Sequence, residues 1–150
     1  MNSTAELRLP FAVRPLTPNL GAEILGVELA NGVSEELFRG IYQAFLRYQV
    51  LLFPPQDVPP GVQVSFARHF GEVQIHVMNM YHAEGYPELY RLSNLDENGR
   101  PNGKHPDVTA MRWHTDRSWR AEPALATLLY GIEIPAVGGD TLFCNTTMAY

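Results

Sequence analysis

The stretch ALATLLYGIEIPAVGGDTLFCN, residues 124–145, sets the expected fold class of this chain. Residues 124–134 predict a β-strand that is bounded by turn-forming residues. The tight connection PAVGGD follows, and residues 141–145 predict a second short strand. A helix is expected to begin directly afterwards, at Thr146 or Thr147, because threonine is a good N-cap residue.

Further towards the N-terminus, the spacing of apolar residues predicts two helices. The first is expected over residues 34–49, with Ser34 as its N-cap and two glutamates in its first turn that complement the helix dipole. The second is expected at about residues 60–70, with Gly71 directly after its end. The first helix should present one apolar stripe, formed by Leu37, Ile41, Ala44, Phe45 and Tyr48.

Strands and one long loop are expected between and after these helices. Residues 21–29 predict a strand, or a pair of strands broken near Gly26, and residues 89–92 predict another. The run at residues 50–53 is apolar on both faces and predicts a buried strand. Residues 95–109 predict an exposed loop. More strand than helix, arranged in sequence, favours an α+β or mostly β architecture.

Composition limits the classes of function. The chain has 150 residues, of which 45% are hydrophobic and 18% are charged, as expected of one soluble globular domain. Its net charge of -5 without a long basic run argues against nucleic acid or an anionic membrane as the partner, so a small molecule is expected. Cys144 is the only cysteine, which suits a reducing compartment. The sequence shows no signal peptide or membrane-spanning run, so a cytoplasmic location is expected.

His114 and Asp116 form the motif with the clearest chemistry. One residue separates them, so on an extended segment both side chains point to the same face. An imidazole nitrogen and a carboxylate oxygen suit a first-row metal, and one further histidine completes the facial triad of non-haem Fe(II) oxygenases. The motif alone is unspecific, and a polar surface pair is the plainer interpretation. A zinc hydrolase that uses an upstream histidine as third ligand is a second metal-based alternative.

Four motifs together resemble the taurine dioxygenase family, which includes 2,4-dichlorophenoxyacetate dioxygenases and alkylsulfatases. They are GAEILGVEL (21–29), FARHFGEVQIH (66–76), WHTDRSW (113–119) and LLYGIEIPAVGGDTLFCNTTMAY (128–150), and they occur in the family's order. The resemblance covers roughly residues 10–150. It implies a double-stranded β-helix core of the jelly-roll, cupin-like type with flanking helices, here incomplete. It also implies Fe(II) as cofactor, with 2-oxoglutarate and O2 as co-substrates.

The resemblance assigns expected roles to five residues. His114 and Asp116 match the family's first two iron ligands, and Thr141 matches the threonine that contacts the 2-oxoglutarate carboxylate. His76 matches a histidine that contacts the acidic group of the substrate, and Trp119 an aromatic residue that lines the substrate pocket. Without the resemblance, Thr141 would be an ordinary strand residue and His76 a structural histidine.

Two departures from the taurine enzymes leave the substrate open. Ala110 stands where those enzymes have an asparagine, four residues before the first ligand. The tyrosine that follows the substrate histidine is displaced by one residue in VMNMYH. The expected substrate is therefore a small acidic organic molecule, whether a sulfonate, a sulfate ester or a carboxylate.

The family's distal histidine and its 2-oxoglutarate-binding arginine are not found after the metal motif. The resemblance therefore implies that residues 1–150 form the N-terminal part of a single catalytic domain. The implied activity is hydroxylation of the substrate coupled to oxidative decarboxylation of 2-oxoglutarate. A truncated or non-catalytic chain that binds a small molecule or a partner remains an alternative, and assembly into a homo-oligomer is left open by the sequence.

Overall fold

The computed structural model describes residues 8–96, 98–102 and 112–150. They form two compact units, which are described separately here. The first unit comprises Met1–Val62 together with Tyr130–Tyr150, and the second comprises Gln63–Leu129. Within the described ranges, no helix has both the length and the apolar character needed to cross a membrane.

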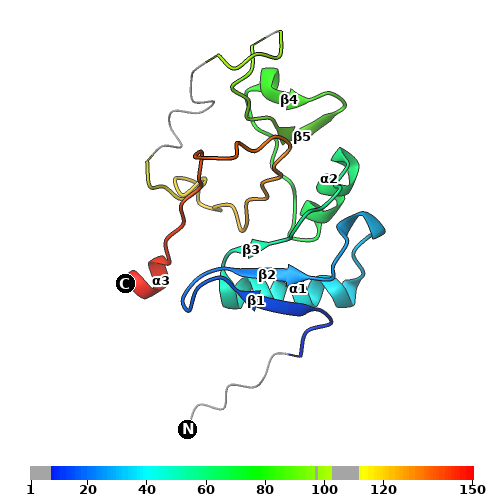
Figure 1. Cartoon of the computed structure of the whole chain (residues 1–150), viewed down its shortest axis with the longest axis vertical. Helices are drawn as coiled ribbons and strands as arrows, with labels where there is room; N and C mark the ends of the chain where they lie inside the picture. Colours follow the sequence, from blue (N-terminus) through cyan, green and yellow to red (C-terminus); the bar gives the residue numbers. More distant parts are fainter. Residues whose placement is uncertain (1–7, 97, 103–111) are drawn as a thin grey trace. The chain divides into compact units, whose positions relative to one another are not determined.

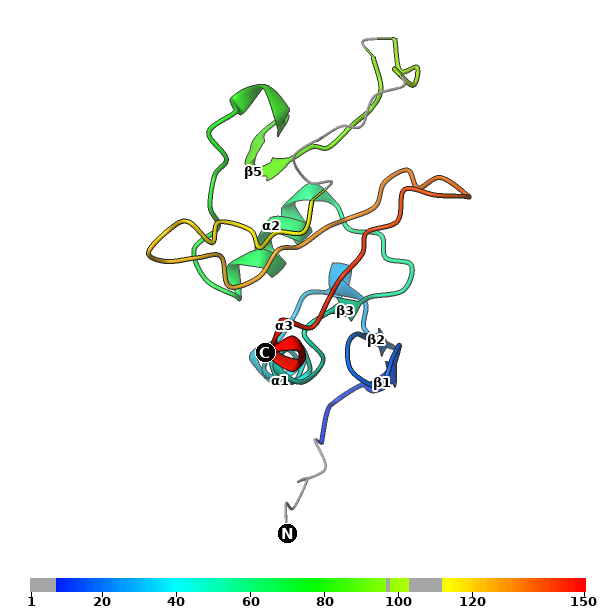
Figure 2. The same cartoon turned by 90° about the vertical axis from the view of Figure 1, so that its left-hand side faces the viewer.

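A three-stranded sheet and one long helix organise the first unit (Figure 1). Strands β1 (Ala12–Pro15) and β2 (Ala22–Leu25) are antiparallel, and β3 (Leu51–Leu52) runs parallel to β2 on its other side. A parallel neighbour requires a crossover, and helix α1 (Glu35–Tyr48) provides it. In Figures 1 and 2, α1 runs alongside this small sheet.

Glycine ends β2 earlier than the sequence pattern predicts. The expected strand at residues 21–29 stops at Leu25, because Gly26 has a φ of 76° and turns the chain out of the extended conformation. A short 3-10 helix, η1 (Leu29–Asn31), follows before α1 begins. The expectation of a break near Gly26 is confirmed, and the expectation of a strand beyond it is wrong.

Helix α1 has the start and the buried face that were expected. The Ser34 hydroxyl accepts a hydrogen bond from the Leu37 amide at 3.2 Å, so the N-cap prediction is confirmed. Ile41 and Ala44 are both 0% exposed, so the middle of the predicted apolar stripe lies in the core, while its other members are half-buried. The helix ends where Gln49 adopts a positive φ of 65°.

Gln56 joins several parts of the core of the first unit. Its side-chain oxygen accepts a hydrogen bond from the Leu29 amide at 2.9 Å, and its side-chain amide donates to the Val27 carbonyl at 3.0 Å. The hydroxyl of Tyr130 donates to the Gln56 backbone carbonyl at 3.1 Å. The buried apolar side chains of this unit are Ala22, Ile24, Val27, Leu29, Ile41, Ala44 and Val58.

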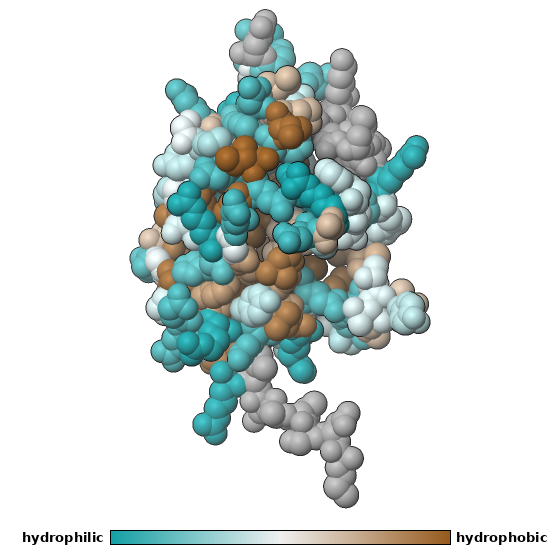
Figure 3. Space-filling view, turned by 180° about the vertical axis from the view of Figure 1, so that it is seen from behind, coloured by the Kyte–Doolittle hydropathy of each residue, from teal (hydrophilic) through white to brown (hydrophobic). Residues whose placement is uncertain are grey.

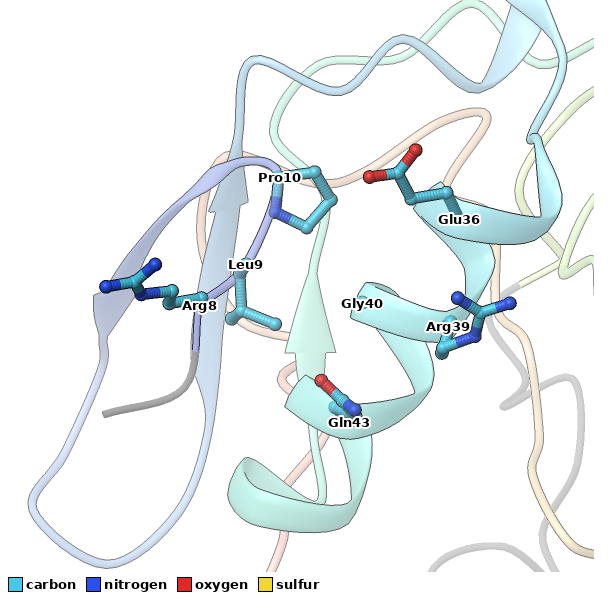
Figure 4. Close-up of a pocket in the computed structure, with 7 residues that line it drawn as sticks. All are labelled: Arg8, Leu9, Pro10, Glu36, Arg39, Gly40 and Gln43. Carbon is cyan, nitrogen blue, oxygen red and sulfur yellow. The ribbon is translucent and has the colours of Figure 1, made fainter. Parts of the chain in front are cut away.

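The N-terminal segment packs closely on α1 at Gly40. A Cβ atom added to this buried glycine would lie 2.7 Å from Cδ of Pro10. Figure 4 shows Pro10 facing the helix at Gly40, beside an open hollow of about 370 Å³. A hydrogen is therefore the only side chain that fits between helix and segment at this point.

We expect Gly40→Ala to lower the free energy of unfolding by about 1–3 kcal/mol, because an overpacked methyl group forces the backbone apart. Alanine is by itself roughly 1 kcal/mol more favourable than glycine within a helix. The cost of overpacking must therefore be larger than this gain for the variant to be less stable than the parent. The measurement is urea unfolding followed by circular dichroism. The control is Gly40→Ala combined with Pro10→Ala, which removes the contacting ring atom and should recover the loss. A single variant that is more stable than the parent would contradict the close packing.

The second unit contains helix α2 and a small hairpin. Helix α2 (Pro60–Arg68) begins in the last residues of the first unit and ends slightly before the expected residue 70. Strands β4 (His82–Ala83) and β5 (Tyr86–Tyr90) form a two-stranded antiparallel sheet, preceded by the 3-10 helix η2 (Asn79–Tyr81). The strand expected at residues 89–92 therefore lies a few residues earlier.

The α2 helix and the hairpin are tied together within this unit. Arg68 at the end of α2 forms an ion pair with Glu88 of β5, with 2.8 Å between Nη2 and Oε1. Val64 and Phe66 of α2 are buried, and the Phe66 ring packs edge-on against Phe70 at 5.6 Å between centroids. The expected apolar spacing of this helix is thus partly confirmed.

The expectations for three strands need correction. Residues 124–134 and 141–145 are not strands, because no described residue pairs with their backbone, and a strand requires such a partner. Strand β3 is not buried on both faces, since it pairs only with β2 among the described strands and Leu52 is 47% exposed. Much of the expected loop at residues 95–109 lies outside the described residues.

The segment before the last helix keeps a strand-like alternation although it is unpaired. Residues 124–130 alternate between half-buried and exposed side chains. Beyond them, Ile132, Ile134 and Val137 are at least 78% exposed. Figure 3 shows apolar side chains, in brown, at the surface among polar ones. Helix α3 (Thr146–Ala149) begins at the expected residue, but its N-cap is Asn145 and not a threonine.

The coarse prediction of a mixed helix and strand architecture is confirmed by these elements. The two small sheets do not by themselves test the double-stranded β-helix.

Candidate metal centre and substrate site

His114 and Asp116 lie side by side in the second unit. Nε2 of His114 is 3.3 Å from Oδ1 of Asp116, and both side chains are about half exposed, at 49% and 48%. Nδ1 of His114 lies 2.7 Å from the Arg112 carbonyl oxygen. Because a carbonyl oxygen only accepts, Nδ1 must carry a proton. In the neutral ring, the lone pair that a metal ligand needs is then on Nε2, the nitrogen that faces Oδ1 of Asp116.

Thr127 fixes the other oxygen of the carboxylate. Its hydroxyl donates to Oδ2 of Asp116 at 2.7 Å. In both candidate ligands, the hydrogen-bonded atom is the one that does not face the other ligand: Nδ1 in His114 and Oδ2 in Asp116. Hydrogen bonds of this kind orient the ligands in metal sites. The sequence analysis missed Thr127, which is the one polar side chain other than Tyr130 in the run ALATLLY at residues 124–130.

The chain turns at the metal motif. The two side chains were expected to share a face on an extended segment, but a turn begins at Asp116 and Arg117 has a positive φ of 54°. The turn is closed by a hydrogen bond from the Arg120 amide to the Arg117 carbonyl at 3.0 Å. His114 and Asp116 still converge at the start of this turn, as their separation of 3.3 Å shows.

The donor set fits a divalent first-row metal. One imidazole nitrogen and one carboxylate oxygen are suitable donors, and their separation of 3.3 Å is close to that of two neighbouring ligands with bonds of about 2.1 Å. Among the described residues, no group of three or more His, Cys, Asp or Glu side chains forms a metal site. The upstream third ligand that the zinc hydrolase alternative needs is therefore absent from this part of the chain, while His105 lies outside it.

His76 is half-buried and has ordered surroundings in the second unit. Its Nδ1 accepts a hydrogen bond from the Met78 amide at 3.2 Å. Its backbone carbonyl lies 2.8 Å from Nε2 of His82. Its ring lies 4.6 Å from the ring of Tyr90, measured between centroids. The structure therefore gives His76 a structural role, and its role in substrate binding stays a prediction.

Trp119 is exposed, and its neighbour Arg120 connects it to the His76 segment. The Trp119 side chain is among the most exposed large side chains, at 79%. The guanidinium of Arg120 lies 5.2 Å from the Trp119 ring and donates to Oε1 of Gln74 at 3.5 Å. Gln74 is two residues before His76. The second unit thus brings together the segments of both expected substrate residues, through two side chains that the sequence analysis did not single out.

Thr141 lies in the first unit and is exposed. The turn before it contains Gly138 and Gly139 at positive φ values of 78° and 74°, a conformation that glycine adopts without strain. The contact of Thr141 with 2-oxoglutarate stays a prediction. Ala110, which bears on the substrate, lies outside the described residues.

Comparison with known proteins identifies the class. Residues 12–150 match the family described as "Taurine catabolism dioxygenase TauD, TfdA family". This match covers nearly the whole chain, so the chain belongs to this family, as the four sequence motifs indicated.

Individual relatives place the chain within that family. It is 33% identical to an alkylsulfatase of Acinetobacter baylyi, over 99% of this chain and 43% of that protein. It is 27% identical to the (S)-phenoxypropionate/alpha-ketoglutarate-dioxygenase of Delftia acidovorans, over 96% of this chain and 49% of that protein. A solved Burkholderia xenovorans structure, assigned as an alpha-ketoglutarate dependent 2,4-D dioxygenase, has a TM-score of 0.55 at 27% identity, over 76% of this chain and 35% of its own. The chain thus spans about half or less of the length of these relatives.

Proposed function

We propose that this chain is the N-terminal part of the catalytic domain of a 2-oxoglutarate-dependent dioxygenase. The observation that carries the proposal is the His114–Asp116 pair, with facing donor atoms 3.3 Å apart and outer atoms held by hydrogen bonds. Membership of the family supports the same reaction. In this proposal, residues beyond Tyr150 supply the distal histidine, the arginine and the remaining strands of a double-stranded β-helix.

The metal in this proposal is Fe(II), with 2-oxoglutarate and O2 as co-substrates. Bound together, they supply C–H hydroxylation coupled to decarboxylation of 2-oxoglutarate to succinate. His114 and Asp116 would hold the ion, and Thr127 would orient the carboxylate of Asp116. The hydroxyl of Thr141 would donate a charge-assisted hydrogen bond to the 2-oxoglutarate carboxylate.

The proposed substrate is a small organic acid. His76 would contact its acidic group, while Trp119 would line the pocket and help to exclude water. Relatives of the chain are named as a sulfonate dioxygenase, an alkylsulfatase and a phenoxypropionate dioxygenase, and each of these names refers to an acidic compound or its ester. A sulfonate, a sulfate ester and a carboxylate therefore all fit the proposal.

The decisive experiment is an anaerobic titration of the complete protein with Fe(II) and then 2-oxoglutarate. We expect a weak visible charge-transfer band when both are present, because a 2-oxo acid chelates an iron that keeps adjacent positions open. Succinate should then form on admission of O2. Tight zinc binding without such a band would refute the dioxygenase and favour a zinc hydrolase.

A further inference from the structure

One cross-strand pair of the β4–β5 hairpin supports His76 from two directions. His82 of β4 and Tyr90 of β5 are Cα partners in the hairpin ladder. His82 reaches the backbone of His76, with 2.8 Å between Nε2 and the carbonyl oxygen, and Tyr90 packs on its imidazole ring at 4.6 Å. A pair that holds both the main chain and the ring of one residue fixes the direction of its side chain.

Hydrogen bonding also fixes the tautomer of His76. A backbone N–H only donates, so Nδ1 of His76, which receives the Met78 amide at 3.2 Å, must be the unprotonated nitrogen. In the neutral ring the proton then lies on Nε2. Among the described residues, none accepts a hydrogen bond from this N–H. In its neutral form, His76 therefore presents one donor that no residue in the described part of the chain uses.

The hairpin that carries the pair is itself held in place. The Tyr81 ring packs on Tyr90 at 5.2 Å, and the Arg91 amide donates to the Tyr81 carbonyl at 2.8 Å. The ion pair between Arg68 and Glu88 ties β5 to α2. These contacts therefore constrain the hairpin that carries both His82 and Tyr90.

We propose that His82 and Tyr90 are positioning residues, which hold His76 as a neutral Nε2–H donor for the anionic oxygen of the substrate. This inference rests on the proposed substrate role of His76. It adds a specific requirement, which is that an uncharged donor on His76 recognises the substrate. His82 and Tyr90 set the orientation of that donor without touching the substrate. Asparagine or glutamine could not replace His76 with the same geometry, because the ring also packs on Tyr90.

The test is nitrogen NMR of the histidine rings in the 150-residue chain, in mildly alkaline buffer, together with amide exchange. We expect His76 to show protonated Nε2 and unprotonated Nδ1. In His82→Ala and Tyr90→Ala, exchange of the Met78 amide should rise about fivefold, as expected when a hydrogen bond worth about 1 kcal/mol is lost. His82→Gln keeps a donor and Tyr90→Phe keeps the ring, so these matched variants should stay close to the parent. The Arg91 amide reports whether the hairpin is intact.

A second readout is the response of the His76 Nε2 signal to methanesulfonate, with sodium chloride at equal ionic strength as control. The signal should shift with methanesulfonate in the parent chain and less in the two alanine variants. A proton on Nδ1, an unchanged Met78 amide in both alanine variants, or no response to methanesulfonate would each overturn the inference. Neither readout involves iron, so failure here is distinct from absence of the iron band, which would refute the dioxygenase itself.

Discussion

Asp116→Ala is expected to abolish the Fe(II)–2-oxoglutarate band and succinate formation in the complete protein. The substitution removes Oδ1, the oxygen that lies 3.3 Å from Nε2 of His114, and with it the negative charge that the site offers to a divalent ion. The loss of iron affinity should exceed the roughly 10–100-fold that follows the loss of an outer hydrogen-bond partner. Anaerobic iron titration by absorbance measures this loss directly.

Two matched substitutions of Thr127 distinguish the metal ligand Asp116 from the residue that orients it. Thr127→Val keeps the shape but removes the hydroxyl that donates to Oδ2 of Asp116, so iron affinity should fall by roughly 10–100-fold without vanishing. Thr127→Ser keeps the hydroxyl and should bind iron nearly as the parent does. Full iron binding by Asp116→Ala would show that the pair is a surface polar contact and not a metal site.

Local signals in the sequence were sufficient for helix α1 and for the end of strand β2 in the first unit. Ser34 as N-cap and the stripe through Ile41 and Ala44 were predicted correctly, because capping and helical spacing act within a few residues. The break near Gly26 followed from the same kind of information, since glycine adopts positive φ without strain.

Strands that depend on distant partners were not predictable in the same way. Residues 124–130 keep the alternation of a strand, but an alternating pattern shows which face is buried and not which backbone pairs with it. Leu51 and Leu52 were expected to be buried on both faces, yet the apolar run does not tell an edge strand from a central one.

The candidate site shows the same difference between local and long-range contacts. The His114–Asp116 spacing was readable because both residues lie within one short motif. The contacts that refine the site join residues far apart in the chain: Thr127 with Asp116, and Arg120 with Gln74. No periodicity or motif encodes such pairs, since they follow from how the chain turns after Asp116.

Ile41→Ala should have the largest effect on stability. Ile41 is 0% exposed and lies on the face of α1 that was predicted to pack in the core. Truncation to alanine leaves a cavity among buried apolar neighbours and should lower the free energy of unfolding by roughly 2–5 kcal/mol. Domains of this size are stable by only about 5–15 kcal/mol, so the loss is a large fraction of the total. Hydrogen exchange of the α1 amides is the most direct measurement.

Leu46→Ala is the control for Ile41→Ala on the same helix. Leu46 is 61% exposed, so its truncation removes little buried area and should change stability by less than about 0.5 kcal/mol. Alanine favours the helix slightly more than either residue it replaces, so helix propensity cannot cause a loss in one variant alone. Equal effects of the two substitutions would mean that α1 does not bury its Ile41 face, and the sheet of β1, β2 and β3 would then lack the cover that the structure gives it.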